Sequence, residues 1–233
     1  MGEVIGPRAD PARIEDHIRR ALRAAIARGG DVGEAASARL APAVADIDSA
    51  QAARAAAREA EETAWAQVEA ADASSDVAIG RLRDEMWSAL GRPRGSPLLD
   101  QVYPGGIGTY TSGDPRSQPV LMQVLHSRIL SASAPQWTKE MRERWAAEID
   151  TYRKSYAAAV EAHRPTEAAA MVADVAHRAA TRAGQLRLRA LKRDLQNLGL
   201  TEAQIHEIIP DDSRPTSSAN QPPPPTPPPV VSA

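Results

Sequence analysis

Apolar residues recur every three or four positions along most of the chain, which is the spacing of an amphipathic α-helix. The period-two alternation of apolar and polar residues that indicates β-strands is missing. The pattern therefore predicts an all-α protein. Its expected helices span about 10–28, 34–90, 117–133, 136–162, 166–198 and 202–209.

Residues that begin or end helices support several of these limits. Asp10 followed by Pro11 is typical of a helix start, because aspartate caps the first turn and proline fits its first position. Thr201 and Gln204 have the spacing of a capping box at the start of the last helix. Pro165 lies between the fourth and fifth helices, where we expect the chain to break.

The second helix is the longest expected element. Between Ala43 and Leu90 the chain contains no proline, and Gly80 is its single glycine. Strong helix formers fill the segment. A new helix could instead be capped at Ser74 or Ser75. We favour one continuous, alanine-rich helix of the coiled-coil type.

Two later helices each have an apolar stripe that we expect to face the core. The stripe of 136–162 contains the bulkiest side chains of the chain: Trp137, Met141, Trp145, Ile149, Tyr152, Tyr156 and Val160. The stripe of 166–198 is made of smaller residues: Val172, Val175, Ala179, Ala183, Leu186 and Ala190.

Composition supports a bundle of closely packed helices. Alanine makes up about a fifth of the 233 residues, far above ordinary usage, and phenylalanine is absent. Alanine favours helix and lets two helix axes approach closely. GC-rich codon usage would also raise the alanine content, and it does not conflict with this interpretation.

Charge and cysteine content exclude several classes of protein. The absence of cysteine rules out disulfides, Cys-zinc sites and thiol nucleophiles, and it fits a reducing cytosol. The formal net charge of −2 gives no overall attraction to nucleic acid. Residues 1–16 contain no apolar run, so we expect no signal peptide, no membrane association and a cytoplasmic protein.

A glycine-rich turn, QVYPGGIGTYTSGDP, occupies residues 101–115. It lacks the lysine of a phosphate-binding loop, and no strand precedes it. We interpret it as a structural turn: Gly105, Gly106 and Gly108 permit positive φ, and Tyr103 and Tyr110 anchor the turn on the bundle. A binding loop is the alternative, since ordered glycine-rich loops often bind ligands.

The sequence offers no catalytic residues, no cofactor site and no metal site. Neither a G-x-S-x-G nor an H-E-x-x-H motif occurs. The nearest match to the Glu-x-x-His pairs of di-iron bundles is Asp174 with His177. Both lie opposite the predicted apolar stripe of 166–198, so we expect a solvated pair.

Four arginines form a basic stripe on the helix 166–198: Arg178, Arg182, Arg189 and Arg193. They fall within roughly 60° of one another on a helical projection. The stripe borders the predicted apolar face, where interhelical ion pairs form. We expect pairing, within or between subunits, with acidic residues of the long helix: Glu59, Glu61, Glu62 and Glu69. Binding of nucleic acid or another anionic partner is the alternative.

The whole chain is thus expected to be an antiparallel helical bundle over 10–209, preceded by a flexible arm at 1–9 and followed by a disordered proline-rich tail at 210–233. We interpret the tail as a spacer, with recognition of its P-x-x-P segments as the alternative. The favoured function is a non-enzymatic scaffold or protein-interaction protein that self-associates as a homo-oligomer. The alternative is a nucleic-acid or anionic-partner binder that uses the basic stripe.

Overall fold

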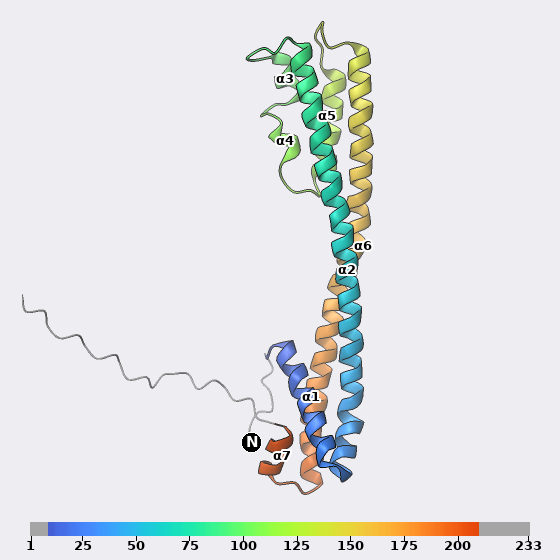
Figure 1. The fold of residues 1–233 in the computed structure, drawn as a ribbon, viewed down its shortest axis with the longest axis vertical. Helices are drawn as coiled ribbons and strands as arrows, with labels where there is room; N and C mark the ends of the chain where they lie inside the picture. The colour runs from blue at the N-terminus through green and yellow to red at the C-terminus, as the bar shows by residue number, and fades with distance from the viewer. Residues whose placement is uncertain (1–8, 210–233) are drawn as a thin grey trace, which may run out of the picture. The chain divides into compact units, whose positions relative to one another are not determined.

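A computed structural model describes residues 9–209, and in this part of the chain the all-α prediction is confirmed (Figure 1). The single non-helical pairing there is an isolated bridge between Ala134 and Trp137. The predicted tail, and the predicted arm except for Ala9, lie outside the described residues. The helices are α1 (Pro11–Arg28), α2 (Gly30–Ala89), α3 (Pro97–Val102), α4 (Gly108–Thr111), α5 (Gln118–Ser131), α6 (Lys139–Asn197) and α7 (Glu202–Ile208).

The helices belong to two compact units. The first unit combines the chain up to Ala50 with the chain from His177 onward, and the second spans Gln51–Ala176. Both long helices, α2 and α6, contribute a segment to each unit. We therefore describe the packing of each unit separately.

Helix α2 runs without interruption through Ser74 and Ser75, as favoured from the sequence. Ser74 donates its hydroxyl to the carbonyl oxygen of Ala70 at 2.7 Å, so it bonds back into the helix and does not cap a new one. Pro42 lies inside the helix and is exposed. Its missing N–H leaves the carbonyl of Ala38 on a solvated face, where water can bond it.

The predicted break at Pro165 is wrong, because α6 is one helix of 59 residues. Pro165 is exposed, and so is Glu161, whose carbonyl loses its helical partner to the proline ring. The Thr166 hydroxyl donates to the carbonyl oxygen of His163 at 2.7 Å and supports the backbone at this point. Residues on both sides of the proline are buried. Their packing stabilises the helix and offsets the free-energy cost of the lost hydrogen bond.

Helix α2 keeps two positions of every heptad buried or partly buried, a pattern that our sequence interpretation missed. One position is alanine in seven consecutive heptads: Ala36, Ala43, Ala50, Ala57, Ala64, Ala71 and Ala78. None of the seven is exposed. The other position varies, from Leu40 and Ile47 to Val68 and Leu82. We call the seven residues the alanine seam of α2.

In the first unit, α1 and α7 contact each other and pack with segments of α2 and α6 (Figure 1). The core consists of isoleucine, leucine and alanine, for example Ile18, Leu40 and Leu191, and includes no Phe, Trp or Tyr. Gly184 of α6 is also buried there. A Cβ atom at Gly184 would lie 2.7 Å from Cδ1 of Ile18 and 3.1 Å from Cδ1 of Ile47, so this position requires glycine for close approach.

The second unit contains all eight tryptophan and tyrosine residues of the chain. Five of them are buried, and α5 contacts both α3 and α4 beside the long helices (Figure 1). Most of the predicted stripe of 136–162 is buried as expected, although Trp137 precedes α6 and does not belong to it. The buried aromatic residues are Tyr103, Tyr110, Trp137, Trp145 and Tyr156.

Ion pairs link antiparallel segments of α2 and α6 within each unit. In the first unit, Arg39 contacts Asp194 at 2.8 Å. In the second, Arg144 contacts Glu85. These pairs are largely exposed, so they contribute little to stability compared with the buried side chains.

Candidate functional site

The stripe predicted to be the core face of 166–198 is exposed, so this prediction is wrong. Val172 and Val175 of the second unit are 69% and 64% exposed, and Leu186 of the first unit is 60% exposed. Helix α6 instead buries its opposite face, where Thr181, Gly184 and Gln185 precede three buried leucines: Leu188, Leu191 and Leu195. The sequence prediction missed this face because polar residues interrupt its apolar pattern, and polar groups can be buried where they find hydrogen-bond partners.

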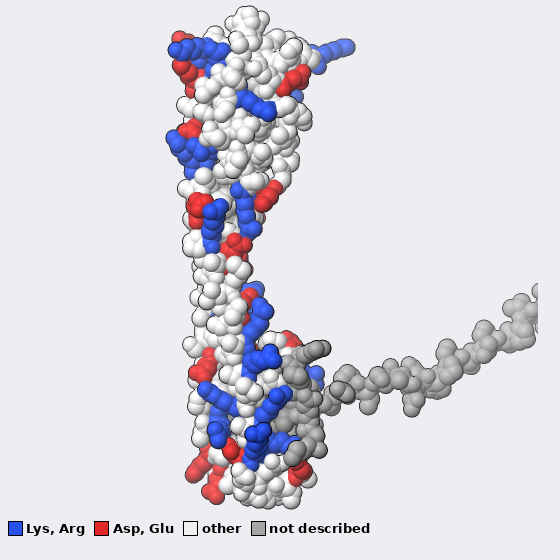
Figure 2. Space-filling model, turned by 180° about the vertical axis from the view of Figure 1, so that it is seen from behind, with Lys and Arg blue, Asp and Glu red and all other residues white. Residues whose placement is uncertain are grey.

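In the first unit, the exposed part of this stripe and the basic stripe lie side by side on α6. Ala179, Ala183 and Leu186 are exposed. The arginines at 178, 182 and 193 are exposed as well, and Arg189 is half-buried. Figure 2 shows basic side chains gathered on the surface of the unit that carries α1 and α7. We call these residues the α6 surface: Arg178, Ala179, Arg182, Ala183, Leu186, Arg189, Ala190 and Arg193.

Charge neutralisation differs between the two edges of α6. Arg187 contacts Asp46 of α2 at 3.2 Å, and Lys192 contacts Glu202 of α7 at 3.2 Å. Within residues 9–209, no ion pair forms at Arg178, Arg182 or Arg193. Three of the four stripe arginines are thus exposed and form no ion pair within residues 9–209.

The acidic residues expected to pair with the stripe belong to the second unit and have other surroundings. Glu59 and Glu62 are exposed, and neither has an ion pair among the described residues. Glu69 accepts a hydrogen bond from Nε1 of Trp65 at 2.9 Å. The expected pairing of these glutamates with Arg178, Arg182 and Arg193 is therefore not made in the part of the chain that is described.

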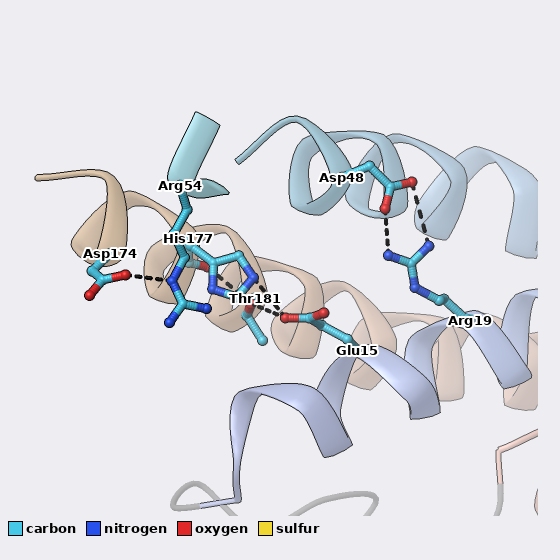
Figure 3. A network of polar contacts seen from close by, with 7 residues as sticks. All are labelled: Glu15, Arg19, Asp48, Arg54, Asp174, His177 and Thr181. Carbon is cyan, nitrogen blue, oxygen red and sulfur yellow. Dashed lines mark hydrogen bonds and ion pairs between the residues drawn. The ribbon is translucent and has the colours of Figure 1, made fainter. Parts of the chain in front are cut away.

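Asp174 lies between two arginines of the second unit. Nε of Arg54 contacts Asp174 at 2.5 Å, as Figure 3 shows, and Nη2 of Arg58 contacts it at 2.9 Å. Hydrogen bonds from Arg58 and Arg54 lower the pKa of the Asp174 carboxyl group to about 2. Its charge is therefore already compensated, which is a structural role and not that of a metal ligand.

His177, expected to be solvated, is instead buried in the first unit. Figure 3 shows His177 and Thr181 of α6 directed toward Glu15 of α1. Nε2 of His177 lies 2.9 Å from Oε1 of Glu15, and the Thr181 hydroxyl donates to the same oxygen at 3.2 Å. Among residues 9–209 there is no group of three or more side chains that could hold a metal ion.

The glycine-rich turn is anchored by both of its tyrosines. The hydroxyl of Tyr103 donates to the carbonyl of Ile79 at 3.4 Å, and that of Tyr110 donates to the carbonyl of Val102 at 3.2 Å. The two rings meet edge to face with centroids 5.9 Å apart. Burial raises the pKa of Tyr103 above its usual value, so this phenol stays protonated and holds the turn.

A pocket of about 540 Å³ lies beside this turn. Gly105 and Gly106, with φ of 82° and 89°, line the pocket. Gly108 begins α4 and does not line the pocket. The side chains of Arg83, Trp87 and Arg94 also line the pocket, together with parts of α3. The sequence did not predict this pocket, because its lining residues come from four separate segments of the chain.

Comparison with known proteins gives no matching family, no similar curated protein and no similar solved structure. No helix within the described residues combines the length and apolar character needed to cross a membrane. The function must therefore be inferred from the two surfaces described above.

Proposed function

We propose that the protein is a non-enzymatic helical scaffold that self-associates through the α6 surface. The observation behind this proposal is that Leu186, at 60% exposure, lies beside exposed arginines that have no acidic partner among the described residues. Apolar residues bordered by charges are typical of helices that pack against a partner helix. Burial of Leu186 in such a contact would contribute about 2 kcal/mol.

The occupant we propose is the acidic stretch of α2 in a second copy of the chain. This stretch exposes Glu59 and Glu62, which have no ion pair among residues 9–209. Small exposed residues, including Ala52, Ala56 and Ala60, surround them and leave room for the bulkier Leu186. Arginine on one copy and glutamate on the other are complementary in charge.

Light scattering coupled to size-exclusion chromatography tests self-association of the full chain. We expect an oligomer at about 100 µM protein. Leu186→Glu should shift it toward monomer, because a carboxylate cannot be buried on the α6 surface without a partner. Val77→Glu is the matched control, since Val77 is an exposed apolar residue of α2 outside both proposed contact areas. A wild-type monomer at this concentration would contradict the proposal.

A charge-reversal pair identifies the partner surface. Arg182→Glu should weaken self-association, and Glu59→Arg should weaken it similarly. Mixing the two variants should restore hetero-association, because each supplies the charge that the other has lost. Failure of the mixture to associate, with both variants folded, would exclude the α2 stretch as the occupant.

An anionic macromolecule is the second candidate partner, favoured by the three arginines whose charge is not paired in the described chain. Phosphate binding through such a ridge depends strongly on salt. Fluorescence anisotropy with labelled single-stranded and double-stranded DNA and RNA tests it. Binding at about 50 mM salt that is lost in Arg182→Glu/Arg193→Glu would support nucleic acid. Absence of binding at low salt would remove this candidate.

A further inference from the structure

The pocket beside the glycine-rich turn, within the second unit, has the size of a small-molecule site. Its volume of about 540 Å³ falls within the range of typical ligand pockets. The end of α2, the segment 93–96, α3 and the turn at 103–107 all contribute to its wall. It is independent of the α6 surface, so the inference drawn from it does not rest on the proposed function.

The charged groups of this pocket favour an anion. Arg83 and Arg94 line it, and Asp100 is its single acidic lining residue. Nη1 of Arg83 contacts Asp84 at 3.1 Å, but Asp84 does not line the pocket. Arg94 has no ion pair among the described residues. Two guanidinium groups against one carboxylate leave a net positive wall, and guanidinium is well suited to carboxylate and phosphate.

An indole ring held in place forms another part of the wall. Nε1 of Trp87 donates to the carbonyl of Pro93 at 3.1 Å. The guanidinium groups of Arg83 and Arg92 lie 6.0 Å and 5.6 Å from the centre of the ring. Arg92 is the one described non-glycine residue with positive φ, at 59°. Such a conformation is costly and persists where the surroundings enforce it, and here it places Arg92 over Trp87.

Three glycines leave part of the remaining wall as exposed backbone. Gly95, Gly105 and Gly106 line the pocket without side chains, so a ligand can approach the main chain there. The turn that presents Gly105 and Gly106 is fixed by a hydrogen bond from the Gly106 N–H to the Tyr103 carbonyl at 2.8 Å and by the buried tyrosines described above. A wall fixed in this way is ordered before any ligand binds, which lowers the entropic cost of binding.

We propose that this pocket binds a small organic anion, with its carboxylate or phosphate at Arg83 and Arg94 and a planar apolar body against Trp87. Side-chain guanidinium groups supply the charge contact, and the indole ring supplies the apolar surface. Carboxylate and phosphate share this recognition chemistry, so the experiment compares them directly.

Phenyl phosphate, benzoate and inorganic phosphate are the probes, each titrated into the ¹⁵N-labelled full chain. The readout is the Nε1–H resonance of Trp87, assigned with Trp87→Phe. We expect a saturable shift with phenyl phosphate or benzoate at submillimolar concentration, and at least about tenfold weaker binding of inorganic phosphate, which lacks the planar body. The stronger of the two organic probes identifies the preferred anionic group.

Variants at the exposed arginines separate a site from unspecific attraction. Arg83→Gln and Arg94→Gln should each weaken the organic probe by about tenfold or more, since one charge-assisted contact is lost. Arg164→Gln is the control, because Arg164 is an exposed arginine of the same unit that does not line the pocket. Loss of affinity in Arg164→Gln equal to that in Arg94→Gln would overturn the proposal. So would unsaturable shifts, or equal binding of inorganic phosphate.

Discussion

The two units of this protein bury their helices with different side chains. The first unit has no Phe, Trp or Tyr among its described residues and brings its helices together around Gly184 and aliphatic side chains. The second holds every Trp and Tyr of the chain and surrounds Trp145, Tyr110 and Tyr156 with aliphatic side chains and methionine. Both units nevertheless use the same alanine seam on α2.

This difference shows that a repeated small residue on one helix does not determine how thick a core becomes. Where α1 covers the seam, the partner helix supplies glycine and the helices approach closely. Where α3, α4 and α5 add further layers, α6 supplies tryptophan and tyrosine instead. The aromatic residues of α6 therefore lie in the unit that also contains α3, α4 and α5.

Trp145→Ala should produce the largest effect and should be confined to the second unit. Trp145 is 3% exposed, with the guanidinium groups of Arg81 and Arg144 at 5.2 Å and 5.4 Å from its ring. Its removal should cost about 3–5 kcal/mol in the free energy of unfolding, measured by urea denaturation. Its indole N–H has no hydrogen-bond partner among residues 9–209, so Trp145→Phe is the control and should cost about 1 kcal/mol. An equal loss in both variants would contradict this packing role.

Gly184→Leu tests close approach in the first unit and should rank second. Leucine favours helix, so any loss reflects crowding against Ile18 and Ile47. We expect about 3 kcal/mol of destabilisation in urea denaturation. Gly80→Ala is the matched control, because it is a glycine inside α2 with nothing within 4 Å of the added Cβ atom. It should stabilise α2 by about 0.5–1 kcal/mol, and stabilisation by Gly184→Leu would refute the close-packing account.

Asp76→Asn should give the smallest effect, and one that depends on pH. Burial, and secondly the charge of Asp72, raises the pKa of Asp76 from 3.8 to about 6. Between these two values the folded protein binds a proton that the unfolded chain does not, so stability falls as pH rises through this window. Asp76→Asn should therefore stabilise the protein at pH above 6 by about 1 kcal/mol, allowing for partial solvation. Below the lower pKa the benefit should vanish.

Urea denaturation of wild type and Asp76→Asn at both ends of that range measures the difference. Other carboxyl groups titrate in both proteins and cancel in the comparison. Asp174→Asn serves as a contrast, because the pKa of Asp174 is lowered and not raised, to about 2. That variant should lose stability at neutral pH. A benefit from Asp76→Asn that is the same at all pH values would point to packing and not to charge.

Much of the fold followed from helix-forming patterns, including the uninterrupted α2 and the capping box at Thr201 and Gln204. The break at Pro165 was mispredicted. A proline in the sequence indicates a lost backbone N–H, but it does not show whether packing of the helix compensates for that loss. The two short helices α3 and α4 were missed, since six and four residues carry too little periodicity.

The candidate sites were less accessible from the sequence. The arginine stripe was identified, but the stripe of Val172 and Leu186 was wrongly assigned to the core. The buried opposite face contains Leu188, Leu191 and Leu195, but the polar residues Thr181, Gln185 and His177 interrupt its apolar pattern. A search for heptads on α2 would have revealed its buried face, and hence the facing residues of α6.

The alanine seam also has a consequence for how the helices find their alignment. Sliding α2 by seven residues would again place alanine at six of the seven seam positions, so these residues distinguish one alignment from the next only weakly. The distinction must come from the second position in each heptad, which changes from leucine to isoleucine, arginine and glutamate along the helix. In the first unit, Ile47 packs against Gly184 of α6, where an added Cβ atom would lie 3.1 Å from its Cδ1 atom. Contact between these two residues therefore fixes the alignment of α2 with α6.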